Sequence, residues 1–123
     1  MLDGNLIVTK SYNFALKIIE LYKFLSKNKR EYILSKQLLR CGTSIGANIQ
    51  EAQAGISKKD FIAKMSIAAK ESLETRYWIN LLIDSGYISK DKQKTKDILE
   101  EIESIIKILT RIIKTSQKEI NEK

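Results

Sequence analysis

The stretch LLRCGTSIGANIQEA, residues 38–52, decides between two kinds of protein. Apolar residues recur in it at helical spacing, but Gly42 and Gly46 interrupt the pattern. A glycine loop that binds phosphate follows a strand and contains Gly-Lys-Ser/Thr or GxGxxG, and neither pattern occurs here. On a helix, glycines four residues apart lie one above the other and let a neighbouring backbone approach closely. Each glycine lowers the stability of the helix by about 1 kcal/mol relative to alanine. We therefore favour a closely packed helix over a ligand loop. The expected counterparts on the following helix are Ala63, Ala68, Ala69 and Ser72.

Apolar residues continue at three- and four-residue spacing on both sides of this stretch. The pattern predicts four helices, over about 11–26, 31–56, 61–82 and 91–113. Ser57 and Asp60 resemble a helix-capping box, and Gly86 suits a helix end. Because the connections are short, the sequence predicts an all-α fold, an up-down-up-down antiparallel four-helix bundle that forms a single domain over residues 1–123.

The composition excludes several classes of site. The chain contains no histidine and a single cysteine, Cys41, so the usual zinc sites and an internal disulfide are not expected. We expect no metal and no cofactor. No apolar run approaches the roughly 18 residues of a membrane span, and the N-terminus does not resemble a signal peptide. We therefore expect a soluble, cytoplasmic protein that does not bind a membrane.

A polar stripe follows the apolar face of the second predicted helix. An antiparallel turn near residues 55–57 places Arg40 level with Glu71 and Glu74, which predicts a cross-helix ion pair. We favour a structural network that sets the helix register. The alternative is an enzyme site with Glu51, Glu71 or Glu74 as general base, but it lacks a histidine or a nucleophile paired with a base. The residues of the network are Arg40, Ser44, Asn48, Glu51, Glu71 and Glu74.

The positive charge is concentrated in two segments. Residues 23–36 and 90–96 contain nine cations and two acids, so their net charge equals the +7 of the whole chain. In an up-down-up-down bundle both segments lie at the same end, which predicts a basic pole suited to the phosphates of RNA or DNA. An ordinary solubilising loop is the alternative. We expect no aromatic platform for single strands, because the aromatic residues are spread along the chain. The candidate nucleic-acid-binding residues are Lys23, Lys27, Lys29, Arg30, Lys36, Lys90, Lys92, Lys94 and Lys96.

The pattern Arg-x-x-x-Ser-Ile-x-x-Asn-Ile-x-Glu extends from Arg40 to Glu51. With Ser57, Phe61 and the residues that follow, it resembles the bacterial four-helix-bundle proteins encoded in intervening sequences of 23S rRNA genes. This resemblance implies rings of five subunits without enzymatic activity. A relative in that group, the accessory variability protein of diversity-generating retroelements, is a basic pentamer that binds nucleic acid and a reverse transcriptase.

The fourth predicted helix carries apolar residues around a wide arc. Ile108 falls outside its main stripe, and Trp78 lies off the seam of the third helix, so we expect an oligomer interface on these two helices. The function predicted is a non-enzymatic homo-oligomeric scaffold that binds RNA or DNA through the basic pole, as a ribonucleoprotein or reverse-transcriptase accessory factor. The alternative is a protein-protein interaction module that binds a partner protein and no nucleic acid.

Overall fold

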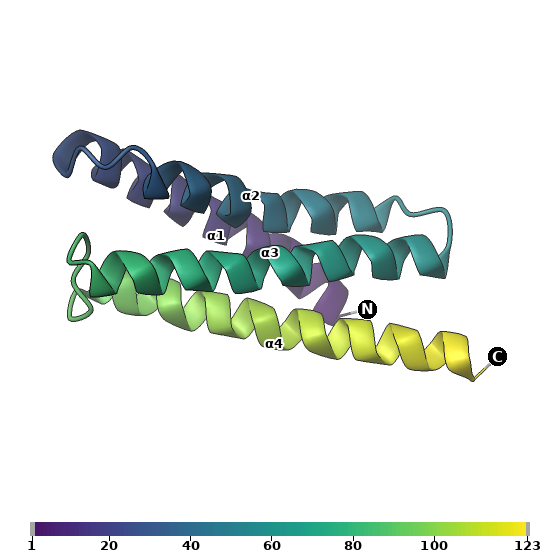
Figure 1. Ribbon diagram of the computed structural model, residues 1–123. Helices are drawn as coiled ribbons and strands as arrows, with labels where there is room; N and C mark the ends of the chain where they lie inside the picture. The colour runs from purple at the N-terminus through teal and green to yellow at the C-terminus, as the bar shows by residue number, and fades with distance from the viewer. Residues whose placement is uncertain (1, 123) are drawn as a thin grey trace.

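The computed structural model describes residues 2–122, with side chains from residue 5 onward. It contains four helices, α1 (Leu2–Asn28), α2 (Leu34–Gln53), α3 (Lys58–Asp84) and α4 (Gln93–Asn121). Each helix packs against its neighbours in the chain, and α4 also packs against α1. The helices alternate in direction (Figure 1). The predicted all-α, up-down four-helix bundle is confirmed.

The helix bounds differ from the predicted ones at several ends. α1 begins nine residues before Ser11, and α4 continues eight residues beyond residue 113. α2 ends at Gln53, so Ile56, which continued the apolar spacing, lies in the turn and is 97% exposed. At the start of α3, the Ser57 hydroxyl accepts a hydrogen bond of 3.1 Å from the backbone N–H of Asp60. This N-cap fixes the start of α3 just after Ile56, so the turn takes up a residue that the hydrophobic spacing had assigned to the preceding helix.

The core contains apolar side chains from every helix. Fully enclosed members include Phe14 and Ile18 on α1, Ile45 on α2, and Ile79 on α3. Side chains of this size stabilise the fold by about 1.5–3 kcal/mol each when they are fully buried. The core positions recur at three- and four-residue spacing, which explains why the hydrophobic pattern predicted the elements correctly.

The two glycines of α2 allow close packing, but against a different helix from the one expected. A Cβ atom added to Gly42 would lie 2.9 Å from Cγ2 of Ile18, and one added to Gly46 would lie 3.4 Å from the carbonyl oxygen of Ser11. Both neighbours belong to α1, so the predicted counterparts on α3 were wrong. Cys41 precedes Gly42 and interacts with Thr75 on α3. One residue further along the helix is a rotation of about 100°, which turns the glycine toward α1.

The apolar arc of α4 is covered within the subunit. Ile108, expected to lie outside the main stripe, is 6% exposed and belongs to the core. Trp78 packs against the core from α3, and its indole N–H donates a hydrogen bond of 3.1 Å to a carboxylate oxygen of Glu74. The expectation that Ile108 lies on an exposed face was therefore wrong, whereas Trp78 is half-buried, and an oligomer interface on α3 and α4 stays a prediction. α4 lies between two helices, so a broad arc is needed to contact both of them.

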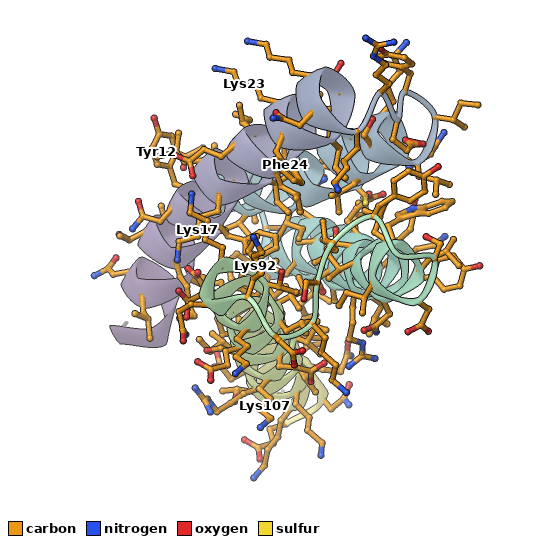
Figure 2. The ribbon with its side chains drawn as sticks, turned by 90° about the vertical axis from the view of Figure 1, so that its left-hand side faces the viewer. Tyr12, Lys17, Lys23, Phe24, Lys92 and Lys107 are labelled. Atoms are coloured by element: carbon orange, nitrogen blue, oxygen red, sulfur yellow. The ribbon has the colours of Figure 1, made fainter. Side chains whose placement is uncertain are left out.

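The first helix is inclined to the other three. Figures 1 and 2 show α1 running obliquely across the bundle, whereas α2, α3 and α4 are more nearly aligned. The α1–α2 and α3–α4 connections lie at one end, and the α2–α3 turn lies at the other end (Figure 1). This arrangement brings segments that are distant in the sequence to the same pole.

Candidate nucleic-acid interface

The basic pole comprises the end of α1, the start of α2, the α3–α4 connection and the start of α4 (Figure 1). The convergence of the two basic segments, expected from the bundle topology, is therefore present. All nine predicted cations are exposed. They are Lys23 and Lys27 on α1, Lys29 and Arg30 in the first connection, Lys36 on α2, Lys90 and Lys92 in the second connection, and Lys94 and Lys96 on α4.

These cations are not neutralised by acids within the subunit. Among the residues that the structure describes, none of the nine forms an ion pair within 4.0 Å. At the opposite end of the bundle, Lys58 and Glu119 are 2.9 Å apart, and Lys64 and Glu51 are 3.7 Å apart. Lys58 and Lys64 at the opposite end thus have acidic partners, whereas the nine cations of the basic pole have none within the described part of the chain. The positive potential of the basic pole can therefore attract an external anion.

A groove of about 970 Å³ opens at the basic pole between α1, the α3–α4 connection and the start of α4. Leu21, Ile88 and Ile98 contribute apolar surface, together with the rings of Phe24 and Tyr87. Figure 2 views this end and shows Lys17 and Phe24 on α1 facing the region of Lys92. The charged residues that line the groove are Lys17, Glu20, Lys29, Lys92, Lys94 and Asp97.

The groove gathers three of the predicted cations, Lys29, Lys92 and Lys94, while the other six lie outside its lining. Sequence reasoning missed Lys17, Glu20 and Asp97, as well as the two aromatic rings. Lys17, Leu21 and Phe24 are separated by four and three residues, so their shared helix face was visible in the sequence. The opposing wall was not visible, because the inclination of α1 determines which residues face it.

Lys17 has a partner, unlike the predicted cations. Its ammonium forms an ion pair with the carboxylate of Glu101 on α4. This hydrogen bond, opposed by partial burial and supported by the charge of Glu101, raises the pKa of Lys17 above its usual 10.5. Lys17 therefore joins α1 to α4 along the groove, and the positive charge without an acidic partner among the described residues comes from Lys29 and Lys92 in the two connections and Lys94 on α4.

In the α1–α2 connection, Arg30 lies just beyond the end of α1, and the side chain of Glu31 caps the start of α2. Arg30 adopts the left-handed conformation with φ of 53°. Glu31 follows it, is 7% exposed, and accepts hydrogen bonds from the backbone N–H groups of Ile33 (3.0 Å), Leu34 (2.6 Å) and Ser35 (3.0 Å). The carboxylate therefore satisfies the first N–H groups of α2. Burial alone raises the pKa of Glu31, but these hydrogen bonds outweigh it and lower the pKa below its usual 4.5.

The second connection has the opposite arrangement. Gly86 ends α3 with φ of 86°, and the backbone N–H of Tyr87 donates a hydrogen bond of 2.9 Å to the carbonyl of Leu82. Lys92 precedes α4 without a side-chain cap, and the described first turn of α4 contains no acidic residue. Lysines beside a helix N-terminus oppose the helix dipole, so this start is electrostatically unfavourable.

The cross-helix pair predicted in the polar stripe is present. The Arg40 guanidinium lies 3.4 Å from Glu71 and also forms an ion pair with Glu74, and it donates hydrogen bonds of 3.3 Å to Gln37. The Arg40 side chain is 51% exposed. An exposed pair of this kind contributes less than about 1 kcal/mol, well below the roughly 3–5 kcal/mol that is lost when one partner of a buried pair is removed.

The rest of the stripe divides into separate contacts. The amide of Asn48 donates hydrogen bonds to the carbonyl (2.9 Å) and the hydroxyl (3.2 Å) of Ser44, one turn earlier on α2. Among the described residues, Glu51 pairs with Lys64 on α3, at 3.7 Å, and not with Arg40. Glu51, Glu71 and Glu74 thus all have cationic partners, and none of the three lines the groove.

Cys41 is buried among the helices. Burial raises the pKa of its thiol above the usual 9.0, more than the hydrogen bond with Thr75 lowers it. The thiol is therefore protonated at neutral pH and poorly nucleophilic. In the part of the chain that the structure describes, no group of three or more cysteine or acidic side chains is arranged to hold a metal ion. Within residues 2–122, no helix has the length and apolar character to cross a membrane.

Comparisons with known proteins agree with the fold. A family model of the 23S rRNA-intervening sequence proteins matches residues 4–111, from α1 into α4. The chain is 46% identical to a protein of unknown function from the S23 ribosomal protein family of Bacteroides thetaiotaomicron VPI-5482. Their match covers 91% of this chain and 98% of that crystal-structure chain, with a TM-score of 0.87. No curated protein matches the chain. The protein belongs to the 23S rRNA-intervening sequence protein family.

Proposed function

We propose that the protein is a non-enzymatic, homo-oligomeric scaffold that binds the backbone of RNA or DNA through its basic pole. The observation that carries this proposal is the convergence of nine exposed cations, without ion pairs among the described residues, at one end of the bundle. Phosphate binding releases condensed counterions, and its strength grows with the number of such cations.

The helix ends at the pole give independent support. Arg30 occupies a left-handed position that glycine adopts without strain, and Lys94 lies in the first turn of α4, where an acid is favoured. Each choice costs folding free energy and places a cation on the exposed surface of the pole. A surface selected only for stability or solubility has no need of cations at these two positions.

The oligomer is proposed from apolar side chains that remain exposed in the subunit. Leu16 on α1 is 49% exposed, and Leu73 and Tyr77 on α3 are 47% and 59% exposed. α1 and α3 are diagonal in the bundle, since each packs against α2 and α4. Two different surfaces on opposite sides suit the heterologous contacts of a closed ring. Five subunits follow from the family resemblance, and the ring would repeat the basic pole around its axis.

The proposal is tested by fluorescence anisotropy with a labelled RNA of 20 nucleotides at several salt concentrations. Lys92→Gln combined with Lys94→Gln is compared with Lys107→Gln combined with Lys114→Gln, which removes the same charge from exposed positions further along α4. The first pair should weaken binding and make the slope of log affinity against log salt shallower by about 1.4 to 1.8. The second pair should have a much smaller effect. Figure 2 shows Lys107 away from the groove.

Absence of binding to RNA and DNA at low salt would refute the nucleic-acid part of the proposal. Equal effects of the two lysine pairs would refute the basic pole as the binding surface. The alternative function, a protein-protein interaction module, is supported if a single partner protein co-purifies after nuclease treatment and the purified protein binds no nucleic acid. The oligomer is tested separately by light scattering, because a mass equal to the 14.1 kDa subunit at micromolar concentration contradicts the ring.

A further inference from the structure

We propose that the groove at the basic pole accommodates an unpaired nucleotide, with its base against the Phe24 ring and its phosphate at the surrounding lysines. The partner would then be single-stranded RNA or DNA rather than a duplex. This inference rests on the proposed function and makes it more specific. It also departs from the sequence-based expectation that the protein has no aromatic surface for single strands.

The groove combines two chemical surfaces that a base and a phosphate require separately. Among its lining residues, Leu21, Ile88 and Ile98 are buried or half-buried and offer apolar contact, whereas Lys29, Lys92 and Lys94 are exposed and form its rim. A duplex presents its phosphates outside and keeps its bases stacked inside, so binding a duplex backbone needs only the rim. The volume of about 970 Å³ is at the upper end of the range of roughly 300–1,000 Å³ usual for small-molecule sites. The groove therefore has room for a nucleotide.

Phe24 is the ring best placed to receive a base. It is 41% exposed although it lies on the groove side of α1, and the Lys29 ammonium is 5.9 Å from its ring centroid. A stacking face and a phosphate-binding cation therefore adjoin one another. Tyr87 lines the groove from the α3–α4 connection and is anchored against the core. Bases of any sequence can stack on such rings, which suits recognition with little sequence preference.

The two acids of the groove restrict where a phosphate can lie. Glu20 and Asp97 face the same space as the lysines, and Asp97 accepts a hydrogen bond of 2.8 Å from the Gln93 side chain. Glu20 is exposed and Asp97 is half-buried, and their charge repels a phosphate from their part of the groove, which leaves Lys29, Lys92 and Lys94 as its position. Carboxylate oxygens also accept hydrogen bonds from the amino groups of unpaired bases. The charge pattern thus favours a base beside the two acids and a phosphate at the three lysines.

The first experiment uses the unaltered protein and three labelled probes of equal length. They are a single-stranded RNA, the same RNA as a duplex, and a strand with abasic sites throughout its centre. The intact single strand should bind about fivefold or more tightly than the abasic strand, because base stacking on aromatic side chains is worth about 1–3 kcal/mol per base. The two strands carry the same number of phosphates, so the difference isolates the bases.

The second experiment alters the ring and keeps the charge. Phe24→Leu should weaken binding of the intact strand about fivefold or more, while the abasic strand and the salt slope should change little. Tyr12→Leu is the matched control, since Tyr12 is another exposed aromatic residue of α1, 66% exposed, and lies away from the groove (Figure 2). The far-UV circular dichroism and thermal unfolding of both variants verify that the helices remain intact.

The outcomes separate this inference from the proposed function. If no probe binds at low salt, both fail. If all three probes bind with similar affinity, or if Phe24→Leu and Tyr12→Leu have equal effects, the protein binds phosphates through the pole but the groove does not take a base. Only a loss that requires both the bases of the strand and the ring of Phe24 supports the proposed occupant.

Discussion

The two connections at the basic pole each pair one favourable helix terminus with one unfavourable terminus. In the first, Arg30 follows the end of α1 at Asn28 in a strained left-handed conformation, but the carboxylate of Glu31 caps the start of α2. In the second, α3 ends at Gly86, which tolerates φ of 86°, but α4 starts beside Lys92 and Lys94 with no acid in its described first turn. The first connection thus has an unfavourable helix end and a favourable helix start, and the second has a favourable end and an unfavourable start.

In both connections, the unfavourable choice is an exposed cation. Glycine in place of Arg30 and an acid in place of Lys94 suit the same backbone better. Glu31 also shows how the pole remains positive, because its carboxylate is turned inward to the N–H groups of α2 and is 7% exposed. The comparison teaches that the fold and the surface charge are separable here, so substitutions can improve one while weakening the other.

Removing the anion that starts α2 should have the largest effect on stability. Glu31→Ala leaves the N–H groups of Leu34 and Ser35 without their partner in a largely buried site. The free energy of unfolding should fall by about 2–3 kcal/mol. Urea unfolding followed by circular dichroism at 222 nm measures it. If the change stays within error, the carboxylate is not the cap that the geometry indicates.

The same carboxylate predicts how stability depends on pH. The pKa of Glu31 is lower in the folded state than its usual 4.5. Its contribution is therefore fully present above about pH 4.5 and is lost as pH falls through the folded-state pKa. Urea unfolding of the parent between pH 7 and pH 2 should show this loss, and Glu31→Gln should show a correspondingly smaller decrease. Parallel curves for the two proteins would contradict the prediction.

Gly86→Ala should break the favourable end of α3. A Cβ atom at this position meets no heavy atom within 4 Å, so the expected cost comes from the backbone conformation alone. A residue with a side chain at φ of 86° should lower the free energy of unfolding by about 1 kcal/mol. Urea unfolding at neutral pH measures this change, and an unchanged midpoint would show that the connection adapts without strain.

Arg30→Gly should improve the unfavourable end of α1. Glycine adopts φ near 53° without a steric penalty, and part of the gain is offset by the greater entropy of glycine in the unfolded chain. We expect the protein to become more stable by about 0.5 kcal/mol and to bind RNA more weakly. Arg30→Ala separates the two effects, because it removes the cation while keeping the strain. Loss of stability in the glycine variant would contradict the comparison with Gly86.

Lys94→Glu should give the smallest change in stability. It should make the fold slightly more stable and weaken RNA binding. An acid in the first turn of α4 interacts favourably with the helix dipole, so the free energy of unfolding should rise by about 0.3–0.5 kcal/mol. Binding to RNA should weaken. Lys107→Glu, in the middle of the same helix, should leave the dipole contribution unchanged. A decrease in stability for Lys94→Glu would show that the lysine has a structural role.

The sequence predicted the helices and their antiparallel order, because hydrophobic spacing and capping residues act locally. It also predicted the cross-helix pair of Arg40, since the register follows from the turn between α2 and α3. It misassigned the partner of the glycines and the environment of Ile108, because both depend on how each helix is rotated in the bundle. An apolar stripe specifies a buried face but not which neighbour covers each position.

By itself, the sequence determined that four amphipathic helices form a bundle and that its charge collects at one end. Hydrophobic periodicity and chain connectivity are sufficient for both conclusions. The tertiary structure alone decided that Lys17 and Phe24 face Lys92 across a groove (Figure 2). That arrangement depends on the inclination of α1, which results from the packing of side chains on α2 and α4 and is not encoded in any local pattern.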